Sequence, residues 1–135
     1  MIPSDVRDGI KTAINITGLR VYDTIPDGLV PPALVIGQIS ITWEYTLANS
    51  LDRGSIDLIL ITGRMSERSA QDYLDSFLTA TGATSIKAKL DAAPTLPKNG
   101  VATVSNSRVV TATPISVSVS GVEMLAYRYT IELWG

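Results

Sequence analysis

The sequence predicts an α+β fold: a mostly antiparallel sheet, two to three helices packed on one face of it, and a long C-terminal hairpin. Three observations lead there. The chain has 135 residues, which fits one compact domain spanning residues 1–135. Valine, isoleucine and threonine number 11, 14 and 14, a bias toward strands. Helical and alternating apolar spacings occupy separate stretches of the chain.

The first segment predicts a helix, because its apolar residues recur at spacings of three and four: Val6, Ile10, Ala13 and Ile14. Ser4 is the expected N-cap, and the helix is expected to end near Thr17 with Gly18 as a left-handed cap. An extended segment at Leu19–Tyr22 then leads into turn-forming residues at 25–28 and paired prolines at 31–32.

Two strands follow. From Ala33 the chain becomes strand-like, and apolar residues then alternate with polar ones at Ile39, Ile41, Trp43, Tyr45 and Leu47. Gly37 marks a bulge, a bend or a break, and the periodicity does not choose among them. Ala48–Gly54 is a polar connection. Ile56–Ile61 is almost continuously apolar, which predicts a central strand buried on both faces.

Two helices and a hairpin complete the pattern. Ser66 caps a predicted helix that runs to about Thr81 and ends at Gly82, and Ser85 opens a short helix that stops before Pro94. A loop follows at residues 95–100. Alternating strands at residues 109–119 and 122–133 flank a turn at Ser120–Gly121. One side of this hairpin carries serines, so we expect it to face water or a partner: Ser116, Ser118 and Ser120.

The composition narrows the classes of function that we expect for this chain. The chain has no cysteine and no histidine, which removes disulfides, thiolate nucleophiles, cysteine-bound metals and the usual imidazole base. An enzyme would have to work with serine, lysine or carboxylates alone, so we expect no enzyme and no cofactor. Eleven basic residues against 13 acidic ones, without a basic cluster, disfavour nucleic-acid binding. Met1–Asp8 lacks a secretory pattern, and no apolar run is longer than that at Leu58–Ile61, which is too short for a bilayer, so the expected setting is intracellular.

Three local groups of residues could bind an ion, but each has a simpler explanation. Gly63–Ser66 precedes a helix and could hold an anion, yet a turn glycine and a helix cap account for it. The acidic pairs Asp5/Asp8 and Asp72/Asp75 could bind a cation, yet helix electrostatics and solvation account for them. We therefore expect no metal site.

The aromatic residues divide into core and surface. Trp43 and Tyr45 share one strand face, as do Tyr127 and Tyr129, which is the spacing of cross-strand core packing. Trp134 has the opposite parity and is the expected exposed ring, suited to an interface.

Several segments together resemble the tail terminator proteins of siphovirus-type phages of actinobacteria, which have long, non-contractile tails. The similar segments are Met1–Arg7, Gly18–Asp27 with Pro31–Ala33, Gly63–Arg64 before Ser66–Asp75, Gly82–Ala83 with Ser85–Ala88, and Tyr129–Glu132. They span most of the chain.

The resemblance implies a single tail-terminator-like domain that forms a homohexameric ring on the finished tail tube. Such a ring halts the addition of tube subunits and presents a surface for the head. Implied partners are further copies of the chain, the major tail tube protein and the head–tail connector or stopper protein, with an opening for DNA. The implied location is the head-proximal end of the virion tail, after assembly in the host bacterial cytoplasm.

A ring joins different faces of neighbouring subunits, so charged and aromatic surface residues are the candidates for its contacts. The interface residues we single out are Asp52, Arg53, Arg64, Lys98, Arg108 and Trp134. Two alternatives stay open. One is a head-side connector or stopper of the same virion, and the other is a small carbohydrate-binding module that uses Trp43, Tyr45 or Trp134.

Overall fold

The computed structural model of the protein describes residues 2–16, 18–23, 32–43, 52–64, 72, 75–79, 81–82, 84–119 and 121–135. Its elements in chain order are α1 (Pro3–Ala13), β1 (Arg20–Tyr22), β2 (Ala33–Trp43), β3 (Asp52–Arg64), α3 (Ile86–Asp91), β4 (Asn106–Val119) and β5 (Val122–Trp134). Residues 72 and 75–78 are also helical. The predicted turns at 25–28 and 31, the strand residues Tyr45 and Leu47, and Ser66 lie outside the described residues.

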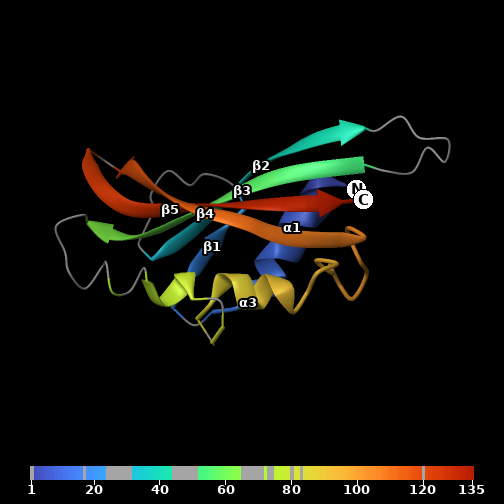
Figure 1. The fold of residues 1–135 in the computed structure, drawn as a ribbon, viewed down its shortest axis with the longest axis horizontal. Coiled ribbons are helices and arrows are strands. Elements are labelled where there is room, and N and C mark those ends of the chain that lie inside the picture. The colour runs from blue at the N-terminus through green and yellow to red at the C-terminus, as the bar shows by residue number, and fades with distance from the viewer. Residues whose placement is uncertain are drawn as a thin grey trace.

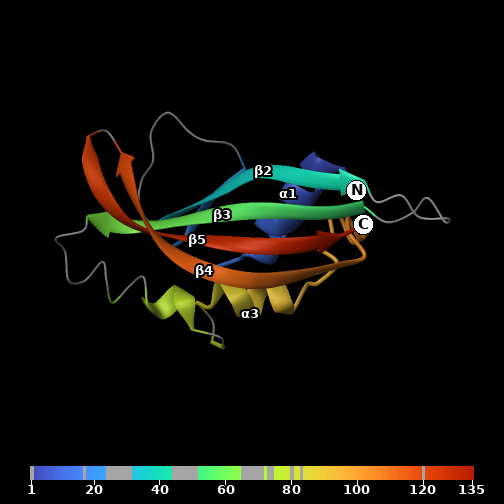
Figure 2. The ribbon, with the colours of Figure 1, turned by 45° about the horizontal axis from the view of Figure 1, so that its top comes forward.

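The five strands form one sheet in the order β1-β2-β3-β5-β4 (Figure 1). Only β1 and β2 are parallel, and the other three pairs are antiparallel. β4 and β5 make the long C-terminal hairpin, and the positive φ of Gly121, 79°, lies in its turn. The helices lie on one side of this sheet (Figure 2). The predicted α+β fold is confirmed.

The core lies between the helices and one face of the sheet, which we call the core face. Alternate residues of β3 point into it, beginning at Ile56, and their cross-strand partners on β2 and β5 share that face. The helical segments supply the other half of the core. Its largest fully buried side chains are Ile10, Leu34, Ile56, Leu58, Leu60, Phe77, Ile86, Leu90, Leu96, Ile131 and Leu133. The opposite side of the sheet is the outer face.

β3 is the central strand, as its apolar sequence predicts. Burial on both faces holds only at one end, where the outer-face residue Ile61 is buried. Asp57 and Ile59, on the outer face of the middle of the strand, are only half-buried. β3 is also longer than expected: Asp52–Gly54 pair with β2 rather than forming a connection, and Gly63 pairs with β5 rather than forming a turn.

Gly37 lies in a β-bulge. Ile36 pairs with Leu58 and Ile39 pairs with Ile56, so two residues of β2 face one residue of β3. A Cβ atom at Gly37 would lie 2.9 Å from the Asp57 carbonyl oxygen, which leaves room only for glycine. The bulge settles the choice that the sequence left open and keeps β2 as one strand.

α1 differs from its prediction at both ends. It begins at Pro3, which lacks an N–H and has φ set for a helix, so Ser4 lies inside the helix instead of capping it. It ends at Ala13. Ile14 and Ile16 are both buried beyond the helix end, at the spacing of an extended chain. Gly18 does have a positive φ of 86°, but it serves a turn rather than the helix cap.

Ser85 caps α3 as predicted, because its Oγ accepts a hydrogen bond from the N–H of Ala88 at 3.1 Å. The same hydroxyl donates to the Thr79 carbonyl and so ties α3 to the segment before it. The last described helical residue of that segment is Leu78, so the helix ends before the predicted end near Thr81, and Gly82, with φ of 111°, lies beyond it. The Ser85 hydrogen bonds help to hold the covering layer of the core in place.

Candidate interaction surface

Four side chains gather on the outer face at one end of the sheet. Arg53 of β3 lies directly opposite Trp134 of β5, and Arg108 of β4 lies directly opposite Glu132 of β5. Opposite partners in an antiparallel ladder share a face, and Glu132 and Trp134 are two residues apart, so all four point the same way. We call Arg53, Arg108, Glu132 and Trp134 the outer-face patch.

Backbone hydrogen bonds hold this end of the sheet together. The N–H of Ser105 donates to the Trp134 carbonyl at 2.8 Å, and the N–H of Gly135 donates to the Asp52 carbonyl at 2.8 Å. Both neighbours of β5 are therefore joined to its last residues. The patch rests on a paired framework rather than on a loop.

A hollow of about 270 Å³ adjoins the patch and is lined by three of its four residues, Arg53, Glu132 and Trp134. Hydroxyl and charged groups make up much of its lining, and Trp134 adds a ring. Its lining residues are Ser40, Thr42, Arg53, Gly54, Ser55, Thr130, Glu132, Leu133 and Trp134. A broad polar surface with one half-buried ring is typical of the rim of a protein–protein interface.

The charges of the patch are solvated. Arg108 Nη2 lies 3.7 Å from Glu132 Oε2, with the two side chains 65% and 43% exposed. An ion pair this exposed contributes little to stability. Both side chains can therefore exchange this contact for one to a partner at small cost in folding free energy. Further along the same face, the Thr130 hydroxyl donates to Asp57 Oδ1 at 3.3 Å.

The six predicted interface residues do not form one site. Arg53, Arg108 and Trp134 belong to the outer-face patch, and Asp52 adjoins it at the start of β3. Arg64 lies at the far end of the same strand, where it pairs with Met124. Glu132, which the sequence analysis did not single out, completes the patch. The cross-strand register places Glu132 opposite Arg108, and this register cannot be derived from the periodicity of the sequence alone.

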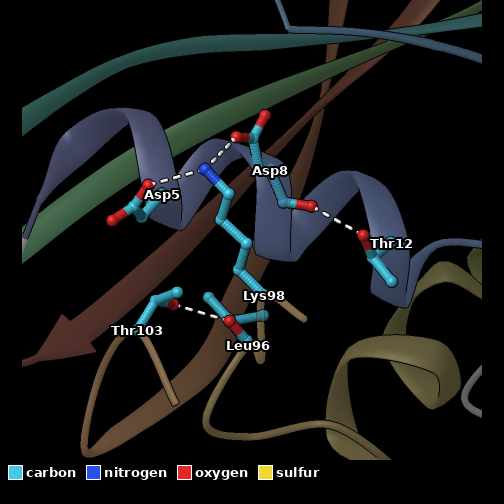
Figure 3. A network of polar contacts seen from close by, with 6 residues as sticks. All are labelled: Asp5, Asp8, Thr12, Leu96, Lys98 and Thr103. Atoms are coloured by element: carbon cyan, nitrogen blue, oxygen red, sulfur yellow. Dashed lines mark hydrogen bonds and ion pairs between the residues drawn. The ribbon is translucent and has the colours of Figure 1, made fainter. Parts of the chain in front are cut away.

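Lys98 lies on the helix-covered side, away from the patch. Its ammonium donates to Asp5 Oδ1 at 2.8 Å and lies 2.9 Å from Asp8 Oδ2, both on α1 (Figure 3). Helix electrostatics alone was the expected role of the two acids, so this long-range ion pair is a new finding. The hydrogen bond from Lys98 holds the pKa of Asp8 below its ordinary value of 3.8. The two carboxylates raise the pKa of Lys98.

The tryptophans are placed differently from the prediction. Trp43, expected in the core, is 75% exposed at the end of β2, while Trp134, expected to be the most exposed ring, is half-buried. Trp43 has core-face parity, but its exposure shows that the core does not extend to this end of β2. Tyr129 is buried and Tyr127 packs against the core, so the prediction for that pair is confirmed.

In the part of the chain that the structure describes, no three acidic side chains come together in a way that would hold a metal ion. No helix of these same residues is long and apolar enough to cross a membrane.

A scan against protein-family models gave no match, and a search of the curated proteins found no relative of this chain.

Proposed function

We propose that this protein is a structural subunit of a phage tail, which assembles as a homohexameric ring on the end of the tail tube, stops its growth and offers a surface to the head. The proposal combines the resemblance of its sequence segments to tail terminators with the outer-face patch. The patch is the observation that carries it, because it gathers three predicted interface residues at one end of the outer face of the sheet.

A ring requires contacts between unlike surfaces of neighbouring subunits. This chain has two unlike sides: helices cover the core face, and the outer face presents polar and charged groups at one end (Figure 2). The patch carries both signs of charge, with two arginines and one glutamate. Mixed charge favours a specific orientation between subunits over nonspecific adhesion.

The carbohydrate-binding alternative receives less support. A sugar platform needs aromatic rings on one surface, but Trp43 follows Thr42, which shares the outer face with Trp134. Successive strand residues point to opposite faces, so the two tryptophans lie on opposite sides of the sheet. Of the two tryptophans, Trp134 would therefore have to act without Trp43. A glycan array with the wild type and Trp134→Ala tests this: binding that depends on Trp134 would favour the module.

The direct test is assembly on tail tubes. Purified protein is mixed with the tail-tube subunit of the same phage and examined by native mass spectrometry and electron microscopy. We expect six-membered rings at tube ends and tubes that no longer elongate. Absence of both rings and tube-end binding, with tubes present as a template, contradicts the proposal. Binding at the head connector instead of the tube would favour the connector alternative.

A charge reversal in the patch supplies the matched variant. Arg108→Glu faces Glu132 with a like charge and removes one of the two arginines, so tube-end occupancy should fall. Arg128→Glu makes the same change of charge on the outer face, four residues before Glu132 on β5 and outside the patch, and should leave occupancy close to wild type. Equal occupancy for both variants would place the contact surface elsewhere.

A further inference from the structure

The outer edge of β4, which is the side of this strand that points away from β5, has the properties of a surface to which another strand can pair. β4 is the last strand of the sheet order and pairs only with β5 among the described strands. It has 14 residues, a length of about 45 Å at the usual rise per residue. Exposure is nearly continuous along its middle, at Thr111, Ala112, Thr113 and Pro114. Edge strands of this kind present backbone N–H and C=O groups that another strand can use.

This edge also lacks the usual protection by charge. About one residue in five of the chain is charged, yet none is charged between Val109 and Val122. Natural edge strands are commonly blocked by lysines or other charges, which prevent unwanted pairing. β4 retains only two milder features, the bulge between Val109 and Thr111 and the single proline at 114. An uncharged edge on an acidic protein also lets a second, equally charged copy approach.

Pro114 indicates which residues of β4 direct their backbone N–H groups away from β5. It stays in register with Tyr127 of β5 although it has no N–H to donate. Proline is tolerated in a ladder where the missing N–H would point away from the paired strand. Ala112 lies two residues away and therefore directs its own N–H to the open side.

We infer that a neighbouring copy of this chain adds its β1 strand to the outer edge of β4, so that the sheet continues from subunit to subunit. This inference rests on the proposed ring, and it names the two strand edges that join neighbouring subunits in it. A head-to-tail contact must join two different surfaces. The described sheet has two edges, β4 and β1, so the β1 edge at Arg20–Tyr22 is the complement of β4.

A matched pair of lysine substitutions tests the edge. Ala112→Lys places a charge on β4, and Ala92→Lys makes the same substitution at an exposed residue just after α3. Rings on tail tubes are counted by electron microscopy while protein concentration is varied. Ala112→Lys should raise the concentration for half-occupancy about tenfold or more, and Ala92→Lys should change it within about twofold. Circular dichroism confirms that both variants fold.

Disulfide trapping identifies the partner strand, and the cysteine-free chain gives a clean background. Chains carrying one cysteine on β4, at Ala112, Thr113 or Ser118, are combined with a second cysteine at Arg20 or Tyr22. At least one doubly substituted chain should form a ladder of oligomers on a non-reducing gel, while Thr113→Cys alone stays monomeric.

The outcomes separate this inference from the proposed function. Rings that form normally with Ala112→Lys, and with no ladder across the panel, overturn the strand pairing but leave the tail-capping role intact. Dimers from Thr113→Cys alone indicate β4 against β4, a two-fold contact, and overturn the pairing with β1. Absence of wild-type rings on tubes counts against the tail-capping role itself.

Discussion

Lys98 donates a hydrogen bond to Asp5 across 93 residues of sequence and so fastens the segment after α3 to the first turn of α1. The segment is shaped for this contact. Lys98 and Val101 exchange backbone hydrogen bonds of 2.8 and 3.0 Å around an Asn99–Gly100 turn with positive φ at both residues. This is the geometry of a two-residue hairpin loop. Lys98 therefore extends from a locally ordered turn rather than from a free loop.

Lys98→Met should lower the midpoint of thermal unfolding. Removing the ammonium leaves Asp5 and Asp8 facing each other without their shared cation. Salt screens such charges, so the difference from wild type should shrink between low and high ionic strength. Differential scanning calorimetry in both conditions measures it. Lys87→Met, which removes an exposed pair within α3, is the control and should have a smaller effect.

The same cluster predicts a dependence on acid. The pKa of Asp8 is below its ordinary value of 3.8 because Lys98 binds the ionised carboxylate. Its contribution to stability is therefore complete above pH 3.8 and is lost as the pH falls through the lower folded value. Urea unfolding between pH 6 and pH 2 should show a shallower acid loss in Lys98→Met than in wild type. Parallel curves would mean that Asp8 is not the responsible group.

Gly9→Ala should destabilise the protein, although alanine normally favours a helix interior. A Cβ atom at Gly9 would lie 2.2 Å from the Leu96 carbonyl oxygen, in backbone that must shift to admit it. Overpacking of this kind lowers the free energy of unfolding by about 1–3 kcal/mol. Urea denaturation measures the loss. Lys11→Ala, at an exposed position of the same helix, should be close to neutral, and a stabilised Gly9→Ala would contradict the close packing.

Tyr129→Phe should cost about 1 kcal/mol of stability, since it removes a buried hydrogen bond without opening a large cavity. The Tyr129 hydroxyl donates to the Phe77 carbonyl at 3.2 Å and connects β5 to the helical residues 75–78. Burial also raises the pKa of this phenol. Chemical denaturation gives the free energy. Tyr127→Phe, on the same strand but half-buried, is the comparison and should change stability by less than about 0.5 kcal/mol.

The two tryptophans should differ in fluorescence. Trp134→Phe leaves only Trp43, which is 75% exposed, and Trp43→Phe leaves only the half-buried Trp134. Acrylamide should quench Trp43 more strongly, and its emission should lie at longer wavelength. Both variants should give the same values in 6 M guanidinium, which serves as the control. Stronger quenching of Trp134 in the folded state would refute the placement of the rings.

Much of the fold could be predicted from the sequence because strong local patterns agree with the final packing. The alternation around Val109–Leu133, the Ser85 cap and the apolar run at Ile56–Ile61 each depend on near neighbours. Element ends were less predictable. α1 stops at Ala13 because Ile14 and Ile16 reach the core in extended form, and spacing alone does not distinguish this from another helical turn.

The candidate site was only partly predictable. Arg53, Arg108 and Trp134 could be chosen as surface residues, but their common face depends on the pairing of β3 and β4 with β5, which is set by long-range register. Lys98 was chosen as a surface residue too, but the structure gives it a different role. Its sequence neighbourhood resembles an exposed loop, and only the packing of that loop against α1 provides its two carboxylate partners.

The position of β3 between β2 and β5 has a consequence for synthesis. β2 precedes β3 in the chain, but β5 is made after every other described element. Until β5 leaves the ribosome, the central strand β3 of the nascent chain has no neighbour on the side where β5 will later pair, and such edges attract other chains. A message that stops short of codon 122 therefore yields a product prone to aggregate rather than a smaller folded protein.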